Sequence, residues 1–198
     1  MTKRVLLLVC GALCLASLFT VGWSARAAGG DGDGPAVGQA APDFSLPWAS
    51  AEGIHLKQDE WLKLSSLKGS AVILAFFPAA WSGGCTTEMC TFRDSWGDLA
   101  KLNAKLYGVS GDYVFTHQAW AKAEKFTFPF LQDHDHAVAK EYGSYMPQYQ
   151  LDKRTVYLID KDGVVRFKNL NFKAGSKEDY DALRAALVKL QSGESAAK

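Results

Sequence analysis

Two cysteines, Cys85 and Cys90, lie five positions apart in the stretch FFPAAWSGGCTTEMCTFRD. A deprotonated thiol is a nucleophile and a metal ligand, and two thiols can form a disulfide, so this stretch is the first candidate for chemistry. The spacing is longer than the C-x-x-C of a dithiol redox turn, and it matches no standard zinc knuckle. From the residues alone, the two cysteines are a redox pair, a structural bridge or a metal site.

The segments around Cys85 predict a strand followed by a helix. Residues 71–77 (AVILAFF) form a continuous apolar run that is typical of a buried central strand, and Pro78 ends it. Downstream of Cys85, apolar residues recur at helical spacing, namely Met89, Phe92, Trp96, Leu99 and Leu102. We therefore expect Cys85 in the first turn of this helix, where unpaired backbone N–H groups and the positive end of the helix dipole favour the thiolate.

The same helix limits what Cys90 can do. In an ideal helix, residues five apart are separated by about 8–9 Å, whereas a disulfide needs Cα atoms within about 7 Å of each other. The two sulfurs cannot bridge while the helix is intact, so the spacing is typical of a pair that bridges only after the first turn unwinds. Gly83 and Gly84, directly before Cys85, make such unwinding easier.

The rest of the chain completes an α/β pattern. In chain order the sequence predicts an extended segment at 41–47, a strand and turn within 60–70, a strand at 104–111, a helix at 112–126, an extended segment at 128–131, a short helix at 136–144, strands at 154–160 and 164–170, and a helix at 176–191. The residues KDG between the last two strands predict a hairpin, and Ser176 is the expected N-cap of the last helix. This order predicts a thioredoxin-like α/β fold, with a central mixed β-sheet flanked by helices.

Length and composition fit one globular domain. The chain has 198 residues, of which 48% are hydrophobic, and its formal net charge is +1. This length is enough for one domain with a core, and the charge gives no reason to expect nucleic acid as a partner.

The N-terminal residues predict export. A basic start (MTKR), a long apolar stretch and the A-x-A pattern of Ala25 and Ala27 predict a signal peptide over residues 1–27. The alternative is a membrane anchor that is not cleaved, because the apolar stretch is nearly long enough to span a bilayer. Cleavage would remove Cys10 and Cys14 and leave two cysteines in an exported, periplasmic protein, where disulfides persist.

The mature chain is expected to consist of three parts. Residues 28–36 (AGGDGDGPA) are rich in Gly and Asp and predict a flexible linker. The folded domain is expected over residues 37–191, and residues 192–198 are expected to form a tail.

The residues around Cys85 resemble those of the peroxiredoxins, the alkyl hydroperoxide reductase C and thiol-specific antioxidant family. Residues 78–85 (PAAWSGGC) match the pattern P-x-x-x-[TS]-x-x-C, and residues 154–160 (RTVYLID) resemble the arginine-containing strand of that family. The resemblance runs from about residue 37 to residue 190. The second cysteine, five positions after the first, is similar to the peroxiredoxin Q class, also called bacterioferritin comigratory proteins.

This resemblance implies a thiol-dependent peroxidase that reduces hydrogen peroxide and organic hydroperoxides without a cofactor. Cys85 would be the peroxidatic nucleophile, which becomes a sulfenic acid. Cys90 would be the resolving thiol, which closes an intramolecular Cys85–Cys90 disulfide that a thioredoxin-like or other dithiol reductant then reduces. The resemblance also implies a monomer or a non-covalent homodimer.

Four further residues carry roles that the resemblance implies. Pro78 would shield the sulfur of Cys85, and the Ser82 hydroxyl would bind the peroxide. Arg154 would stabilise the thiolate and hold the peroxide oxygens, while Glu88 would orient Arg154. Taken singly, each has a structural explanation, as a strand terminator, a helix N-cap, a surface residue and a first-turn acid. Together, at family spacing around a helix-start cysteine, they favour function.

Two positions depart from the family. Trp81 and Gly84 stand where other residue types are common. The bulk of Trp81 would narrow or reshape the access of peroxide, and Gly84 would loosen the first helical turn.

Two other functions stay open. An exported thiol–disulfide oxidoreductase of thioredoxin type would need a C-x-x-C motif, which is absent. A copper-binding thioredoxin-like protein would have C-x-x-x-C and a distal histidine, but the gap here is one residue longer. The run DHDH at 133–136 is an alternative metal site, although such a run favours a solvated turn and helix start.

Overall fold

The computed structural model describes residues 32–192, so the expected signal peptide and nearly all of the expected tail lie outside the described residues. The strands are β1 (Ser45–Leu46), β2 (Trp48–Ala49), β3 (Ile54–His55), β4 (Leu62–Lys63), β5 (Ala71–Phe76), β6 (Ala104–Ser110), β7 (Phe130–Gln132), β8 (Tyr145–Met146), β9 (Leu151–Asp152), β10 (Thr155–Ile159) and β11 (Val165–Asn169). The helices are α1 (Gly83–Lys101), α2 (Val114–Glu124), α3 (Ala137–Glu141) and α4 (Lys177–Gln191), with short 3₁₀ turns η1 (Gln58–Glu60) and η2 (Leu64–Leu67).

The predicted mixed sheet is confirmed. Seven strands pair in the order β11-β10-β5-β6-β7-β2-β3. The neighbours β5, β6 and β7 run parallel, whereas β10 is antiparallel both to β5 and to β11. The β10–β11 pair is the predicted hairpin, and its turn includes Gly163 with φ at +86°. All six residues of β5 are buried, because helices or loops cover both faces of the sheet.

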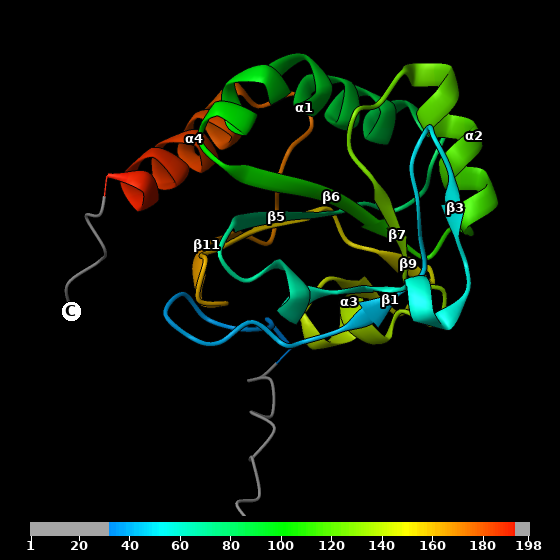
Figure 1. Cartoon of the computed structure of the whole chain (residues 1–198), viewed down its shortest axis with the longest axis horizontal. Helices are drawn as coiled ribbons and strands as arrows, with labels where there is room; N and C mark the ends of the chain where they lie inside the picture. Colours follow the sequence, from blue (N-terminus) through cyan, green and yellow to red (C-terminus); the bar gives the residue numbers. More distant parts are fainter. Residues whose placement is uncertain (1–31, 193–198) are drawn as a thin grey trace, which may run out of the picture.

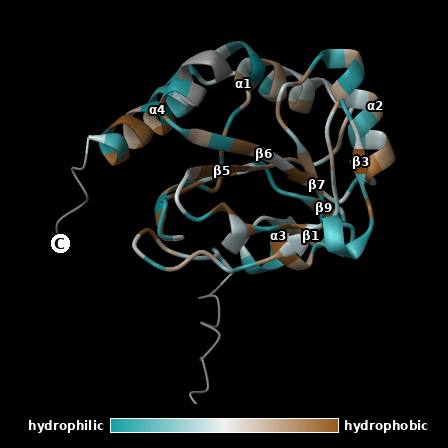
Figure 2. Cartoon of the chain, viewed as in Figure 1, coloured by the Kyte–Doolittle hydropathy of each residue, from teal (hydrophilic) through white to brown (hydrophobic). Residues whose placement is uncertain are grey.

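Two apolar cores lie on opposite faces of the sheet. Helices α1, α2 and α4 cover one face. Helix α3 and the two paired strands β1 and β4 cover the other face (Figure 1). Side chains of β5 alternate between the two cores, so Ile73 packs with Met89 of α1, while Leu74 packs with Tyr142 after α3. Hydrophobic residues accordingly concentrate on the strands between the helical layers (Figure 2).

Several boundaries differ from the expectation for local reasons. Helix α1 begins at Gly83, two residues before Cys85. Helix α2 ends at Glu124, because Lys125 adopts the left-handed conformation, with φ at +55°. The two-residue strands of the β2–β3 and β8–β9 pairs had no sequence prediction, since such short segments carry no periodicity.

Part of the expected linker lies against the domain. The Tyr157 hydroxyl donates to the carbonyl of Asp33 over 3.4 Å, and a Cβ on Gly34 would lie 2.3 Å from the backbone carbonyl of Tyr142. Within residues 32–192, no helix has both the length and the apolar character needed to cross a membrane.

Gly108 of β6 shows how closely the core is packed. A Cβ there would lie 2.5 Å from the ring of Phe130 and 3.2 Å from the ring of Phe77. We expect Gly108→Ala to lower the free energy of unfolding by about 1–3 kcal/mol, as overpacking of a core does. Urea unfolding measures this, with Gly175→Ala as the control, since a Cβ at Gly175 meets open space. Equal midpoints for Gly108→Ala and the unchanged protein would contradict the packing described here.

Candidate active site

The end of β5 places Cys85 at a fixed point beside the sheet. The Phe77 N–H donates to the carbonyl of Val109 over 3.0 Å, which continues the β5–β6 pairing to the last residue before Pro78. After a short loop, α1 begins, and Cys85 lies in its first turn, as predicted, with 1% of its surface exposed. Its sulfur is therefore presented at the N-terminus of a helix yet largely covered.

Strand pairing then brings Arg154 to this sulfur. Thr155, the first residue of β10, pairs with Phe76, the last residue of β5, so the residue before β10 lies beside the chain that leads into α1. The Arg154 Nη2 donates to the Cys85 Sγ over 3.4 Å. A charged donor aimed at sulfur stabilises the thiolate, the reactive form.

Glu88 completes a buried ion pair with Arg154. The Arg154 Nη1 donates to the Glu88 Oε2, while the side chain of Glu88 is fully buried and that of Arg154 is 19% exposed. Burial raises the pKa of Glu88 to about 7, and the charge of Arg154 opposes this rise. Since residues three apart lie on one helix face, Cys85 and Glu88 meet the same guanidinium through different nitrogens.

Pro78 and Ser82 lie in the loop between β5 and α1. The Ser82 hydroxyl donates to the carbonyl of Ala79 over 3.0 Å, and the Ser82 carbonyl accepts the Thr86 N–H over 2.8 Å. Pro78 is half-buried directly after the buried end of β5. The structure thus joins Cys85, Glu88 and Arg154 by direct contacts, and places Ser82 in contacts within the loop and the first helical turn.

The two departures from the family pattern flank the site. Trp81 is 53% exposed and adopts the left-handed conformation, with φ at +66°. A Cβ on Gly84 would lie 3.3 Å from the Arg154 Nη2, which is tighter than an ordinary contact. Glycine at this position therefore leaves room for the guanidinium next to Cys85.

A second network, which the sequence did not reveal, holds the loop before α1. The Asp112 Oδ2 accepts the Ala80 N–H over 2.7 Å and the Ser110 hydroxyl over 3.0 Å. The Ser110 Oγ is also 2.9 Å from the Nε2 of His117, whose pKa burial lowers to about 3. Because Ser110 already donates to Asp112, the neutral His117 donates from Nε2. Ser110 ends β6 and Asp112 follows two positions later, a stretch whose residue types are common in turns but do not identify these partners.

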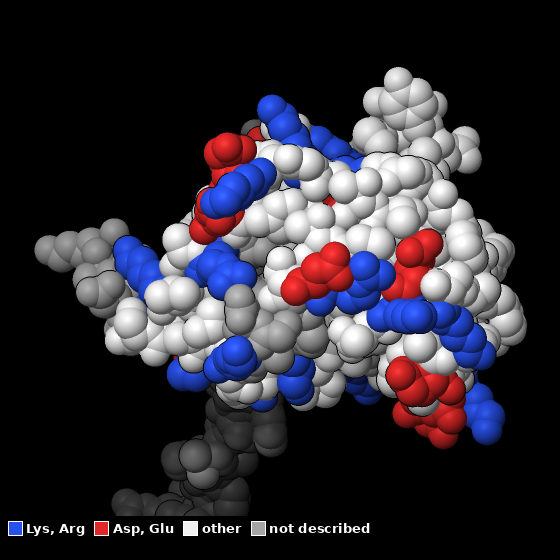
Figure 3. All heavy atoms as spheres, turned by 90° about the horizontal axis from the view of Figure 1, so that it is seen from above, with Lys and Arg blue, Asp and Glu red and all other residues white. Residues whose placement is uncertain are grey.

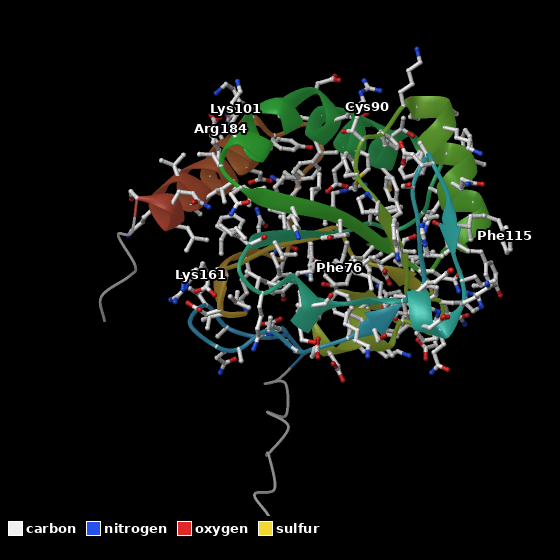
Figure 4. The ribbon with its side chains drawn as sticks, viewed as in Figure 1. Phe76, Cys90, Lys101, Phe115, Lys161 and Arg184 are labelled. Atoms are coloured by element: carbon white, nitrogen blue, oxygen red, sulfur yellow. The ribbon has the colours of Figure 1, made fainter. Side chains whose placement is uncertain are left out.

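Cys90 faces a different set of neighbours from Cys85. Its Sγ lies 3.8 Å from the Oε2 of Glu124 at the end of α2, and both cysteines are free thiols. Burial raises the pKa of the Cys90 thiol. Figure 4 shows Cys90 on the side of α1 that is turned toward α2.

The DHDH run supports a helix start. Asp133 accepts the Val138 N–H over 3.1 Å and the Ala139 N–H over 2.7 Å at the beginning of α3, and the His136 Nδ1 lies 2.6 Å from the Asp152 Oδ1. Within the described part of the chain, no group of three or more His, Cys, Asp or Glu side chains is placed to hold a metal ion.

Known proteins share both the sequence and the architecture of this chain. The AhpC/TSA family profile matches residues 37–168. A bcp-type peroxiredoxin of Coxiella burnetii is 39% identical over 135 residues, which are 65% of this chain and 84% of that protein. The chloroplastic peroxiredoxin Q of Populus jackii is 37% identical over 131 residues, which are 65% of this chain and 57% of that protein.

A solved structure agrees with these relatives. The crystal structure of the peroxidoxin BcpB from Mycobacterium tuberculosis is similar with a TM-score of 0.67 and 31% identity, over 78% of this chain and 97% of that chain. The predicted thioredoxin-like fold is thereby confirmed. With the family profile over more than half of its length, the chain belongs to the AhpC/TSA family and is a peroxiredoxin, a thiol-dependent peroxidase.

Proposed function

We propose that Cys85 is the peroxidatic residue of this enzyme and that its substrates are hydrogen peroxide and organic hydroperoxides. The Cys85 thiolate attacks one peroxide oxygen, the O–O bond breaks, and the other oxygen leaves as water or alcohol after it takes up a proton. The sulfur becomes a sulfenic acid. The observation that carries this assignment is the Arg154 Nη2–H that points at the buried Cys85 Sγ over 3.4 Å.

In this proposal Arg154 acts on both the thiolate and the departing oxygen. Its planar guanidinium offers several donors in a fixed geometry, and negative charge moves from sulfur to oxygen during the reaction. Glu88 fixes the plane of the guanidinium through the other nitrogen. Pro78 would shield the sulfur, as the resemblance implies, and a rotation of the Ser82 hydroxyl away from the Ala79 carbonyl would free it to bind peroxide.

Resolution uses Cys90. The Cys90 thiolate attacks the sulfenic sulfur, an S–S bond forms, and the hydroxyl leaves as water after protonation. Since both cysteines belong to α1, the first turns of this helix must unwind before the Cys85–Cys90 disulfide closes. A thioredoxin-like or other dithiol reductant then restores the two thiols.

We further propose that the chain is exported to the periplasm by the signal peptide at 1–27, with membrane anchoring as the alternative, and that it acts as a monomer or a non-covalent homodimer. The N-terminal sequence pattern supports export. In Figure 3 basic and acidic side chains alternate over the face seen from above, which does not favour nucleic acid as a partner there.

The two other functions find less support in the site. A copper-binding protein would place cysteine sulfur among neutral or anionic ligands, whereas the Cys85 Sγ accepts a bond from a guanidinium cation. A thioredoxin-type oxidoreductase would have its two sulfurs ready to pair, whereas Cys85 contacts Arg154 and Cys90 contacts Glu124.

The assignment of the two cysteines predicts distinct variants. Cys85→Ser is expected to abolish peroxide reduction, because a serine hydroxyl stays protonated near neutral pH. Cys90→Ser is expected to consume about one equivalent of peroxide and then stop as the sulfenic acid. Dimedone labelling and mass spectrometry would locate that sulfenic acid. Full turnover by Cys85→Ser would place the nucleophile elsewhere.

Arg154 is expected to control the peroxide step. Arg154→Met should slow the reaction of Cys85 with hydrogen peroxide by about 10²–10⁴-fold, because it removes the cation and its oriented donors. Arg154→Lys should recover only part of the rate, since an ammonium lacks the planar fork. Single-turnover rates measure this, with Arg166→Met as a matched control, because Arg166 pairs with Asp160 away from the site. A rate equal to that of the control would remove Arg154 from the mechanism.

Glu88 predicts a pH dependence. Because its pKa of about 7 lies above the ordinary value of 4.5, the native state binds this proton more tightly than the unfolded chain does. The free energy of unfolding should therefore fall as the pH rises from about 4.5 to about 7, and this part of the dependence should vanish in Glu88→Gln.

The same titration should appear in the peroxide step. Below about pH 7 the protonated Glu88 no longer forms an ion pair with Arg154, so the rate constant should decrease there, and Glu88→Gln should lack this step and remain slow. Glu178→Gln is the control, because Glu178 is exposed on α4. Identical pH profiles for Glu88→Gln and the control would contradict the role of the ion pair.

A further inference from the structure

The environment of Cys90 is built by the end of helix α2. Glu124, the last residue of α2, places its Oε2 3.8 Å from the Cys90 Sγ. The same residue is fixed through its backbone, since the Arg93 Nη1 donates to the Glu124 carbonyl over 2.6 Å. The next residue, Lys125, closes the helix by donating its N–H to the carbonyl of Ala121. The carboxylate therefore extends from a well-held point, and Cys90 is the thiol that it meets.

We propose that Glu124 is a positioning residue that holds Cys90 as a thiol on the intact helix α1 and thereby slows closure of the Cys85–Cys90 disulfide. This inference rests on the roles proposed above for the two cysteines. It assigns a regulatory task to a residue outside the contacts of Cys85, Glu88 and Arg154.

Closure requires two changes at Cys90, and Glu124 opposes both. The thiol must lose its proton, but a carboxylate about 4 Å away disfavours a second negative charge. The Cys90 sulfur must also move away from the end of α2 to reach Cys85, and this movement breaks the S–H···O contact with Glu124. The step as a whole joins the thiol and the sulfenic acid into a disulfide and releases one water, so the proton of Cys90 leaves with the hydroxyl of the sulfenic acid.

The remaining charges near Cys90 do not reverse this effect. Arg93 and Asp94, both on α1, face the thiol together with Glu124 from α2. Arg93 favours the thiolate, but its Nε donates to the Asp94 Oδ1 over 2.8 Å, so part of its charge is compensated. Burial is the largest cause of the raised pKa of the Cys90 thiol. Arg93 lowers this pKa, and Glu124 and Asp94 raise it, so the net direction is upward.

A role of Glu124 as a general base would have the opposite sign. A carboxylic acid is a much stronger acid than a thiol, so transfer of the proton from a thiol to a carboxylate is unfavourable. The repulsion between the carboxylate and the thiolate needs no such transfer. The geometry therefore favours a residue that delays closure over one that promotes it.

Delay has a consequence for the fate of Cys85. While α1 remains folded, the sulfenic acid stays in its pocket beside Arg154, where a second peroxide can oxidise it to the sulfinic acid. Faster closure removes the sulfenic acid from this competition. The balance between disulfide and sulfinic acid is thus expected to depend on Glu124.

The test compares closure rates in the full chain. Glu124→Gln keeps the size of the side chain and removes its charge, and Glu124→Ala also removes the contact, while both keep the backbone carbonyl that Arg93 binds. Lys122→Gln, on an exposed residue of the same helix end, is the control for a change of charge. Reduced protein is mixed with one equivalent of hydrogen peroxide at pH 7, quenched in acid at intervals, and assayed for disulfide by mass spectrometry.

We expect Glu124→Gln to close the disulfide about threefold to tenfold faster than the unchanged protein, because the Cys90 thiol loses its proton more readily once the neighbouring negative charge is removed. The pH profile of closure should move to lower pH, and less sulfinic acid should form at high peroxide. The peroxide step, measured in the Cys90→Ser background, should not change. Closure that is slower than or equal to that of the Lys122→Gln control would overturn the proposal.

The experiment distinguishes the proposed function of the two cysteines from the role of Glu124. A failure of the Cys90→Ser protein to form a sulfenic acid at Cys85 would overturn the proposed function, and this inference with it. A normal sulfenic acid with an unchanged closure rate in Glu124→Gln would overturn the role of Glu124 alone.

Discussion

The buried ion pair between Glu88 and Arg154 is the interaction on which the rest of the site depends. A carboxylate without solvent contact is costly unless a cation and hydrogen bonds compensate it, and Arg154 offsets part of this cost with its charge and one hydrogen bond. The same guanidinium has a second nitrogen directed at Cys85. The carboxylate that needs a partner thereby determines where the donor to the sulfur lies. A single cation directly before β10 thus serves two residues that are one helical turn apart on α1.

The strand pairing makes this arrangement possible without a long loop. Because β10 runs antiparallel to β5, the residue that precedes β10 lies where β5 ends and the chain turns into α1. Arg154 and Cys85 are therefore close although they lie 69 positions apart in the sequence. The network of Asp112 and Ser110 then holds the connecting loop through the Ala80 N–H. Sheet register, and not local sequence, sets the distance from nitrogen to sulfur.

The sequence could predict what depends on local pattern. The apolar run of β5, the helix that contains both cysteines and the β10–β11 hairpin follow from periodicity and turn residues, and the Cys85–Glu88 spacing places both on one helix face. The partners of Asp112 and Glu124 could not be predicted, because neither the register of parallel strands nor the packing of α2 against α1 is written in a local pattern. The role of Gly84 could not be predicted either, because the space that it leaves for Arg154 exists only after β10 is in place.

In the proposed cycle, oxidation dismantles part of the arrangement that activates Cys85. Glu88 lies between the two cysteines in the sequence, so the unwinding that lets Cys90 reach Cys85 also moves the carboxylate that holds Arg154. The backbone carbonyl of Glu88 accepts a bond from the Tyr180 hydroxyl over 3.4 Å, which ties this turn of α1 to α4. Closure of the disulfide therefore works against the ion pair, the helix hydrogen bonds and this contact together. In this proposal reduction restores all three, so the site that activates the thiolate re-forms only when the thiol is free again.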